Sequence, residues 1–282
     1  MLRNPADIRS LGLLSAVLCL EIGAIVYYHK IPALLLPPVW ILLAFAVFTA
    51  TLINHNHRHL CTFDNAWLNR TLNCLLTVAI GAPSTRLHAI HTYNHHKEYR
   101  TTDDWAHYSL AGSGRGVRRV LSYYARAALR IARMRKTLPM SPQESRELRI
   151  EYAVLFLWLA AWLAFDALPA LVVLVPAWLG GQMILLIANL VNHDYCDLES
   201  PYDLARNFHS RIENWVFLNN GFHTAHHRRT SLHWSKLREV HESHFSDKCD
   251  PDLQSNSFLA YFFRHYLLGQ ASNSRSGHRF RK

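Results

Sequence analysis

The sequence predicts an all-α integral membrane protein with four transmembrane helices, arranged as two hairpins, and a helical cap on one face of the membrane. Two observations support this fold class. Half of the 282 residues are hydrophobic and only 18% are charged, whereas a soluble domain averages about 25% charged residues. The apolar residues are also concentrated in four runs. These runs cover residues 11–28, 31–53, 152–165 and 167–191.

Each of the four runs can supply one membrane-spanning helix. About 20 helical residues, with a range of roughly 17–25, cross the apolar core of a bilayer. The first, second and fourth runs reach this length, and the third reaches it with its flanks, over residues 150–168. Pro32, Pro37 and Pro38 lie in the second run, but neighbouring helices can satisfy the backbone groups that a proline frees in a membrane. The first run exceeds the roughly 7–15 apolar residues of a signal peptide, so we expect a retained helix.

The positions of Lys and Arg predict which segments face the cytoplasm. The short turn between the first two runs holds only Lys30, and the turn between the third and fourth holds no basic residue. Dense basic series occupy residues 84–151 and the segment after the fourth run. Because Lys and Arg favour the cytoplasmic side, we expect both termini and these two long segments to be cytoplasmic.

The segment from Gly114 to Pro139 combines eight Arg and Lys residues with apolar ones. This mixture predicts a basic amphipathic helix on an anionic lipid leaflet. A docking face for an acidic protein or a phosphate-bearing substrate is the alternative, and membrane spans on both sides argue against nucleic-acid binding. We expect residues 1–270 to form a single membrane-integrated domain and residues 271–282 to form a basic, disordered tail.

Three short histidine clusters lie in the segments predicted to be cytoplasmic. Their spacings are HxxxH, HxxxHH and HxxHH. Residues four apart lie on one face of a helix, and neutral imidazole is a common ligand of transition metals. Asn189 and His193 have the same spacing at the end of the fourth run, where a polar side chain indicates a functional site. The candidate ligands are His55, His59, His91, His95, His96, His193, His223, His226 and His227.

Nine imidazoles are too many for one ion, because tetrahedral zinc takes four ligands and octahedral metals take six. The pattern predicts two ions held by the helical cap, with Asn189 or water completing a shell. Iron suits nitrogen-rich ligands without thiolate, and zinc fits equally well by affinity. Asp103, Asp104 and His233 are candidates to orient the ligands from behind, although solvated loop acids are equally compatible with the sequence. His57 projects from the opposite face to the first pair, which predicts a surface role.

These motifs resemble those of the membrane-bound fatty acid desaturase superfamily, in particular its bacterial type. The segments His55–His59, His91–Asp103 and Asn219–Ser235 are similar to the three histidine boxes of that family. Asn189 and His193 match its Asn-xxx-His pair, which adds a ninth histidine and an asparagine linked to the metal through water. The resemblance covers most of the chain.

The resemblance implies a di-iron centre at the cytoplasmic face that uses dioxygen and two electrons to desaturate a fatty acyl or lipid chain. It also implies a multi-pass protein of a bacterial inner membrane. None of the five cysteines forms a CxxC pair, so we expect a separate electron donor (ferredoxin-, rubredoxin- or cytochrome b5-like) with its reductase. Alternatives are a hydroxylase, ketolase or oxidative decarboxylase on the same scaffold and, more distantly, a membrane metal-binding or transport protein.

One departure from the resemblance concerns the second box. It has three residues between His91 and His95, where many acyl desaturases have two. This difference weakens any transfer of substrate class from the acyl-CoA enzymes to this chain.

Overall fold

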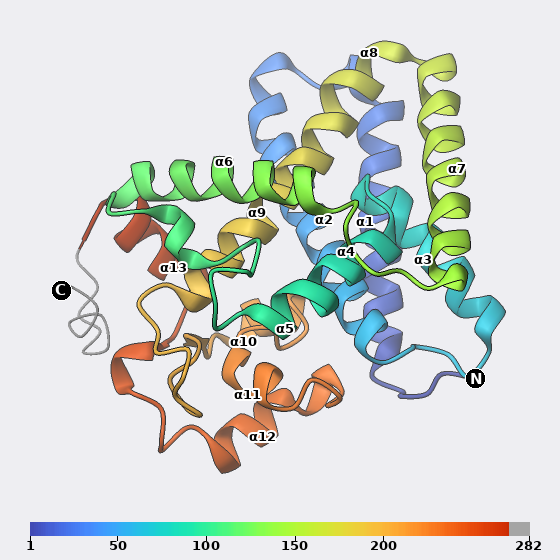
Figure 1. Cartoon of the computed structure of the whole chain (residues 1–282). Coiled ribbons are helices and arrows are strands. Elements are labelled where there is room, and N and C mark those ends of the chain that lie inside the picture. The colour runs from blue at the N-terminus through green and yellow to red at the C-terminus, as the bar shows by residue number, and fades with distance from the viewer. Residues whose placement is uncertain (271–282) are drawn as a thin grey trace. The chain divides into compact units, whose positions relative to one another are not determined.

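A computed structural model describes residues 1–270 and is mostly helical, which confirms the predicted fold class (Figure 1). The tail expected at residues 271–282 lies outside the described residues. A small parallel pair of strands, β1 (Asn207–Phe208) and β2 (Gln254–Ser255), departs from an all-helical chain. The helices are α1 (Asp7–Val26), η1 (Tyr28–Lys30), η2 (Ala33–Leu35), α2 (Leu36–His59), α3 (Ala66–Ile80), α4 (Ser84–Ile90), η3 (His91–His95), α5 (His96–Glu98), η4 (Tyr108–Ala111), α6 (Gly116–Met134), α7 (Pro142–Phe165), α8 (Ala167–Pro169), η5 (Ala170–Leu174), α9 (Val175–His193), α10 (Arg211–Val216), α11 (His223–Arg228), η6 (Trp234–Lys236), α12 (Leu237–His244), η7 (Pro251–Leu253), α13 (Phe258–Phe262) and η8 (Phe263–Leu267).

The internal contacts divide the chain into two compact units. Unit 1 comprises residues 1–89 and 139–185, and unit 2 comprises residues 90–138 and the chain from residue 186 onward. The helix α9 therefore contributes its first part to unit 1 and its last part to unit 2. A single membrane-integrated domain over residues 1–270 stays a prediction.

Four helical segments of the described chain are long and apolar enough to cross a membrane. They are Asp7–Val26, Ala33–His59, Pro142–Phe165 and Ala167–His193. Each overlaps one predicted run. These four segments indicate an integral membrane protein.

The ends of the second span differ from the prediction. The helix α2 begins at Leu36, so Pro37 and Pro38 occupy its first turn, where backbone amides have no intrahelical partner in any case. Neighbouring helices are therefore not needed to compensate these two prolines. At its other end α2 continues to His59, so the first histidine cluster forms the last turn of the same helix.

The third span also begins earlier than its apolar run. In α7, the Ser141 side chain accepts from the Glu144 amide and the Glu144 carboxylate accepts from the Ser141 amide. This capping box starts the helix ahead of the first apolar residue. The polar first turns of α7 thus lengthen a span whose apolar run is short.

The first part of α9 packs closely on α2 within unit 1. A Cβ added at Gly180 would lie 2.8 Å from the Ala44 Cβ, and one at Gly181 would lie 2.3 Å from Val47 Cγ1. The two glycines therefore let the backbones approach, as small residues do between membrane helices.

The predicted basic helix is α6, in unit 2. Its buried face carries Arg119, Val120, Tyr123 and Ala127. Apolar side chains also point outward, and Leu121 is 59% exposed. Contact of this outer face with an anionic leaflet stays a prediction.

Candidate metal centre

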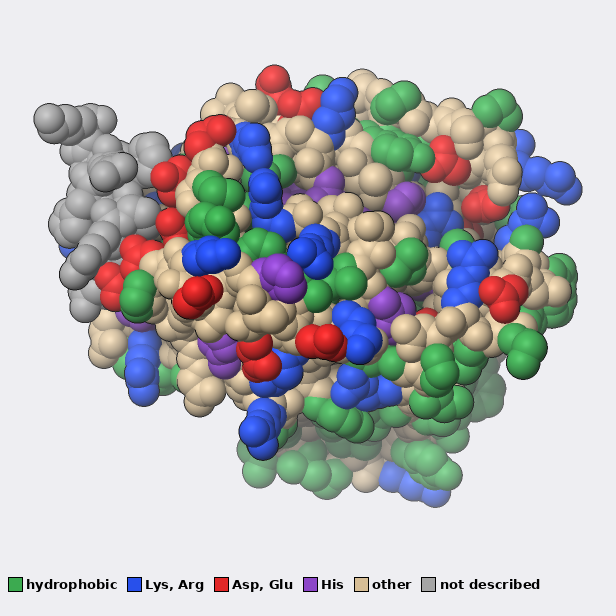
Figure 2. Space-filling view, turned by 90° about the horizontal axis from the view of Figure 1, so that it is seen from below, with side chains coloured by type: hydrophobic (Ala, Val, Ile, Leu, Met, Phe, Trp, Pro, Cys, Tyr) green, Lys and Arg blue, Asp and Glu red, His purple; other side chains and the backbone are tan. Residues whose placement is uncertain are grey.

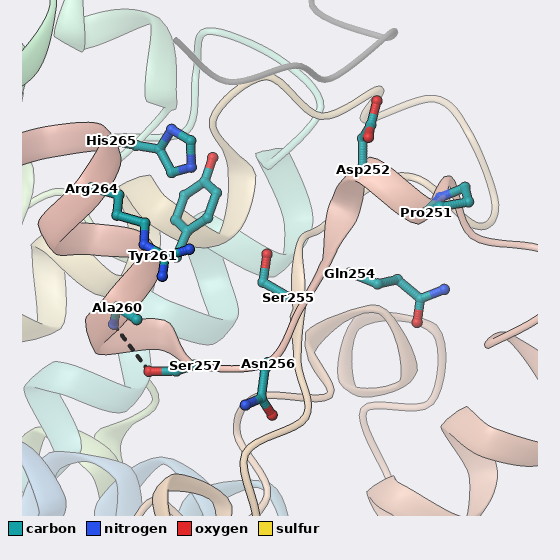
Figure 3. A pocket seen from close by; sticks show the side chains of 10 residues that line it. All are labelled: Pro251, Asp252, Gln254, Ser255, Asn256, Ser257, Ala260, Tyr261, Arg264 and His265. Carbon is teal, nitrogen blue, oxygen red and sulfur yellow. Dashed lines mark hydrogen bonds between the residues drawn. The ribbon is translucent and has the colours of Figure 1, made fainter. Parts of the chain in front are cut away.

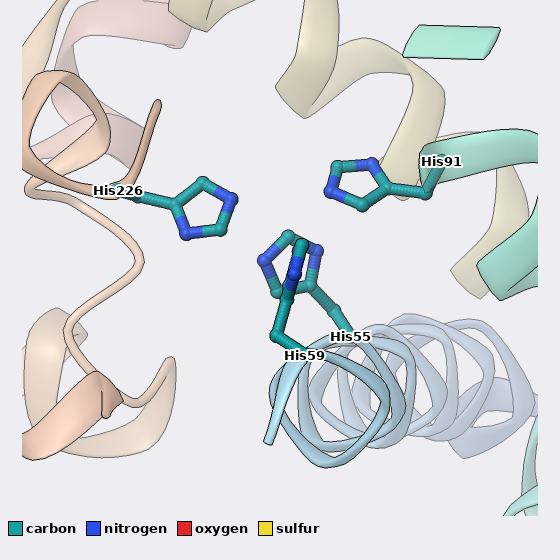
Figure 4. Close-up of side chains that lie close together, drawn as sticks. All are labelled: His55, His59, His91 and His226. Atoms are coloured by element: carbon teal, nitrogen blue, oxygen red, sulfur yellow. The ribbon is translucent and has the colours of Figure 1, made fainter. Parts of the chain in front are cut away.

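The first histidine cluster lies on the last turn of α2, in unit 1. His55 and His59 are one helical turn apart, and their ring centroids are 4.7 Å apart. Figure 4 shows both imidazoles on the same side of α2. The pair can therefore offer two nitrogens to one face of the helix.

His57, between them, is not the surface residue that we expected. Its side chain is buried, with 3% exposed. The Thr62 amide donates to its Nδ1 at 3.2 Å, and the Thr62 hydroxyl lies 3.0 Å from the same atom. The chain that follows α2 therefore folds back over this face of the helix, and the hydrogen bonds between His57 and Thr62 hold it there.

The second cluster begins in a π-helical turn instead of an α-helix. In η3 the amide of His96 donates to the carbonyl of His91, five residues earlier. The ring centroid of His91 lies 4.3 Å from that of His96 and 5.4 Å from that of His95. The third cluster, with its HxxHH spacing, lies on the α-helix α11. The wider turn in η3 thus accommodates the one additional residue of HxxxHH and still brings its three imidazoles together.

His95 is held by the chain that follows the second cluster. Its Nδ1 lies 2.9 Å from Oδ2 of Asp104, and both residues are buried. Burial would raise the pKa of the Asp104 carboxyl, but the charge and hydrogen bond of His95 and the bond from the Ala106 amide hold it below its ordinary value. A carboxylate only accepts hydrogen bonds, so Nδ1 of His95 carries a proton, and in the neutral imidazole the lone pair is then on Nε2. That Nε2 is buried and has no hydrogen-bond partner within residues 1–270.

The loop before α11 is fixed by a buried asparagine and a glycine. The Thr224 amide donates to Asn207 Oδ1 at 3.0 Å, and Asn207 Nδ2 donates to the Thr224 hydroxyl at 2.9 Å. A Cβ at Gly221 would lie 2.4 Å from the Phe208 carbonyl oxygen, so the close approach to β1 requires glycine. These contacts set the first turn of α11 and with it His223.

His193, at the end of α9, meets these histidines within unit 2. Its Nδ1 donates to the Leu204 carbonyl at 3.1 Å, which leaves the lone pair on Nε2. The Nε2 of His223 lies 3.3 Å from Nε2 of His193 and 3.2 Å from Nε2 of His227. One ligand nitrogen each from His95, His193 and His227 lie within 4.8 Å of one another.

This arrangement fits a bound cation. Two nitrogens that each lie about 2.1 Å from a tetrahedral ion are about 3.4 Å apart, close to the separations of 3.2 and 3.3 Å around His223. Burial and the neighbouring imidazoles lower the pKa of His223 and of His227 well below 6.5, so both are neutral at pH 7. Each neutral imidazole offers one lone pair, and one cation can be bound by several such nitrogens that converge in a buried site. The histidine clusters are therefore suited to a metal site.

A second group of imidazoles lies beside the first, also in unit 2. The Nε2 of His96 is 3.2 Å from Nε2 of His226, and the ring centroids of His91 and His226 are 6.1 Å apart. Figure 4 shows the His91 and His226 rings extending from η3 and α11. Seven of the nine candidate ligands thus belong to unit 2, and His55 and His59 belong to unit 1.

Asn189 is bonded to protein through its amide nitrogen. Nδ2 donates to the Ala106 carbonyl at 2.9 Å and to the Tyr123 hydroxyl oxygen at 3.0 Å. The side-chain atom left to bind a water is the amide oxygen. Asn189 therefore also helps to hold the loop behind His95.

The remaining orienting candidates behave differently from Asp104. The Asp103 side chain is exposed, and its backbone carbonyl accepts from Asn94 Nδ2 at 2.9 Å. The Nδ1 of His233 lies 2.9 Å from the Ser235 hydroxyl and accepts from the Ser235 amide, which caps η6.

Two side chains behind the site were missed by sequence reasoning. Asn94 sits between the histidines of the second cluster, and its Oδ1 accepts from the Trp105 amide at 2.7 Å. Its position within the cluster could have indicated a role. Tyr123 gave no such signal, because it reads as one more apolar residue of the basic amphipathic helix.

Other surface features of the molecule lie outside these clusters. A hollow of about 450 Å³ in unit 2 is lined by residues of β2, η7, α13 and η8 and contains no candidate ligand (Figure 3). Figure 2 shows a face on which Lys and Arg side chains are interspersed with Asp and Glu side chains.

A comparison with known protein families gives a match. The sequence model of the family described as fatty acid desaturase matches residues 32–255, which include all nine candidate histidines. A comparison with curated proteins gives no match. Because the family match covers well over half of the 282 residues, the chain belongs to the fatty acid desaturase family.

Proposed function

We propose that the protein is a membrane di-iron oxidoreductase that uses dioxygen and an external electron donor to desaturate a fatty acyl or lipid chain. One observation carries the proposal: Nε2 of His95, whose imidazole is oriented by Asp104, lies close to ligand nitrogens of His193 and His227. The chain that holds this group belongs to the fatty acid desaturase family. The family supports an oxidoreductase with a lipid substrate.

The proposal assigns all nine histidines to two ions. His95, His193, His223 and His227 form one group of unit 2, and His91, His96 and His226 form the other. The proposal requires His55 and His59 to complete the set, with Asn189 bound through a water. Iron is the proposed metal, and zinc would occupy the same ligands in a protein produced without iron.

A bound iron pair would supply the capacity to activate dioxygen, and the protein would hold it in place and control access. Dioxygen takes two hydrogen atoms from adjacent carbons of the chain and two electrons with two protons from the donor, which gives one double bond and two waters. Buried Asp104 holds a proton on Nδ1 of His95, so this imidazole would bind a metal through Nε2 in one tautomer.

The remaining assignments concern the surroundings of the site. We infer that the termini and histidine clusters face the cytoplasm of a bacterial inner membrane, where the positive-inside rule puts the basic segments. The electron donor is a separate ferredoxin-, rubredoxin- or cytochrome b5-like protein with its reductase. No nucleic acid is involved.

The test is conversion of a labelled lipid pool by iron-loaded protein in bilayers, with dioxygen, a ferredoxin and its reductase. We expect a product that has lost two hydrogen atoms, and we expect His95→Ala to form none. His244→Ala is the matched control, because His244 is exposed and bonds its neighbour Ser243. A product that gains one oxygen would identify a hydroxylase, a shortened alkene a decarboxylase, and full activity in His95→Ala would refute the proposal.

A further inference from the structure

Behind His95 lies a loop that three separate elements hold in place. The loop is Asp103–Ala106, and Asp104 within it bonds His95. From η3, Asn94 bonds the Asp103 carbonyl and the Trp105 amide, on either side of Asp104. From α6 and α9, Tyr123 and Asn189 bond the carbonyl of Ala106.

Tyr123 is the member of this network that is farthest from the metal ligands in the sequence. Its side chain is completely buried, and its hydroxyl donates to the Ala106 carbonyl at 2.8 Å. The same hydroxyl oxygen accepts from Asn189 Nδ2 at 3.0 Å. A hydroxyl that makes both bonds inside a protein core specifies one position for its partners.

The backbone of Ala106 connects Tyr123 to the carboxylate of Asp104. The Ala106 amide donates to Asp104 Oδ1 at 2.9 Å, and Asp104 Oδ2 accepts from His95. The hydroxyl of Tyr123 is thus linked to Nδ1 of His95 through the backbone of Ala106, whose amide and carbonyl belong to successive peptide units, and through the Asp104 carboxylate. Every residue of this link belongs to unit 2.

We propose that Tyr123 is a positioning residue, which fixes Asp104 through Ala106 and so keeps the Nε2 of His95 directed toward the metal. The inference rests on the proposed metal site. Through Tyr123, the basic helix α6 would help to orient the metal ligand His95, in addition to any contact of this helix with lipid.

The test is a double-mutant cycle on metal affinity. Apo protein in detergent is titrated with Co²⁺ against a chelator, and its ligand-field spectrum is recorded. Direct removal of the orienting group, Asp104→Ala, should weaken binding roughly 10–100-fold. Tyr123→Phe keeps the ring and removes the two hydrogen bonds of the hydroxyl, to the Ala106 carbonyl and from Asn189 Nδ2, so it should weaken binding by about three- to tenfold and alter the spectrum. Tyr124→Phe, on the same helix and half-buried, is the matched control and should match wild type.

The cycle separates positioning from general stability. If Tyr123 acts through Asp104, the double variant should bind Co²⁺ no more weakly than Asp104→Ala alone. Fully additive losses, or wild-type affinity in Tyr123→Phe, would overturn the inference. Failure of the wild type itself to bind metal would instead refute the proposed function. Thermal unfolding of each apo variant verifies that it is folded.

Discussion

Replacement of Arg119 by methionine tests the best-formed ion pair of unit 2. The guanidinium donates to both carboxylate oxygens of Asp194, at 2.7 and 2.5 Å, and the Tyr266 hydroxyl donates to the same carboxylate at 2.8 Å. Arg119 is 8% exposed and Asp194 is 1% exposed. Asp194 directly follows His193, so this pair fixes the end of α9 against α6.

The expected loss of free energy of unfolding follows from the surroundings of Asp194 in Arg119→Met. The Asp194 side chain stays buried with the Tyr266 hydroxyl as a remaining partner. Removal of one partner of a buried ion pair costs about 3–5 kcal/mol. At about 2–4 °C per kcal/mol, the melting temperature should fall by roughly 6–20 °C. Differential scanning fluorimetry of the apo protein in one detergent measures this shift.

Two further variants make the result decisive. Arg118→Met, at an exposed neighbour on the same helix, should change stability by less than about 0.5 kcal/mol. Arg119→Met combined with Asp194→Leu replaces the pair by apolar side chains and should cost less than Arg119→Met alone. If Arg119→Met is as mild as Arg118→Met, or if the double variant is worse than the single, the reasoning is wrong.

Three other predictions concern chemistry, pH and the membrane. Burial raises the pKa of the Cys249 thiol to about 11, so maleimide at pH 8 should modify exposed Cys61 in the folded protein and Cys249 only after unfolding, as read by peptide mass spectrometry. Burial also lowers the pKa of His241 to about 4. Between pH 6.5 and 4 the unfolded chain therefore binds one more proton than the folded protein. As the pH is lowered through this window, the free energy of unfolding should fall by up to roughly 3 kcal/mol. Unfolding curves of His241→Gln should lack this part of the pH dependence. In bilayers with anionic lipid, a spin label at Leu121 should be less accessible to a water-soluble relaxation agent than one at Arg133, and equal accessibility would contradict contact of α6 with the leaflet.

The four membrane spans and the histidine clusters could be predicted from the sequence because both depend on local patterns. Apolar runs of membrane-crossing length specify helices whatever surrounds them. The ends of these helices were less predictable, because they depend on caps. Pro37 and Pro38 lie in the first turn of α2, and the Ser141 capping box starts α7. An apolar run does not show where either helix begins.

The contacts behind the histidines could not be read from periodicity. Helical spacing predicts which side chains share a face of an α-helix. It does not predict the π-turn of η3, in which the His96 amide donates to the His91 carbonyl and closes a wider turn. Spacing also put His57 on the outer face of α2, where the returning chain at Thr62 covers it. The bond from Tyr123 to Ala106 joins segments that no local pattern relates.

The most direct test of the central claim is the iron content of the purified protein, measured by mass spectrometry of the metal against amino-acid analysis after production in iron-replete cells. We expect two irons per chain in wild type and in His244→Ala, and fewer in His95→Ala. A wild-type protein with one iron or none after iron loading, or a His95→Ala variant that retains two, would contradict this claim.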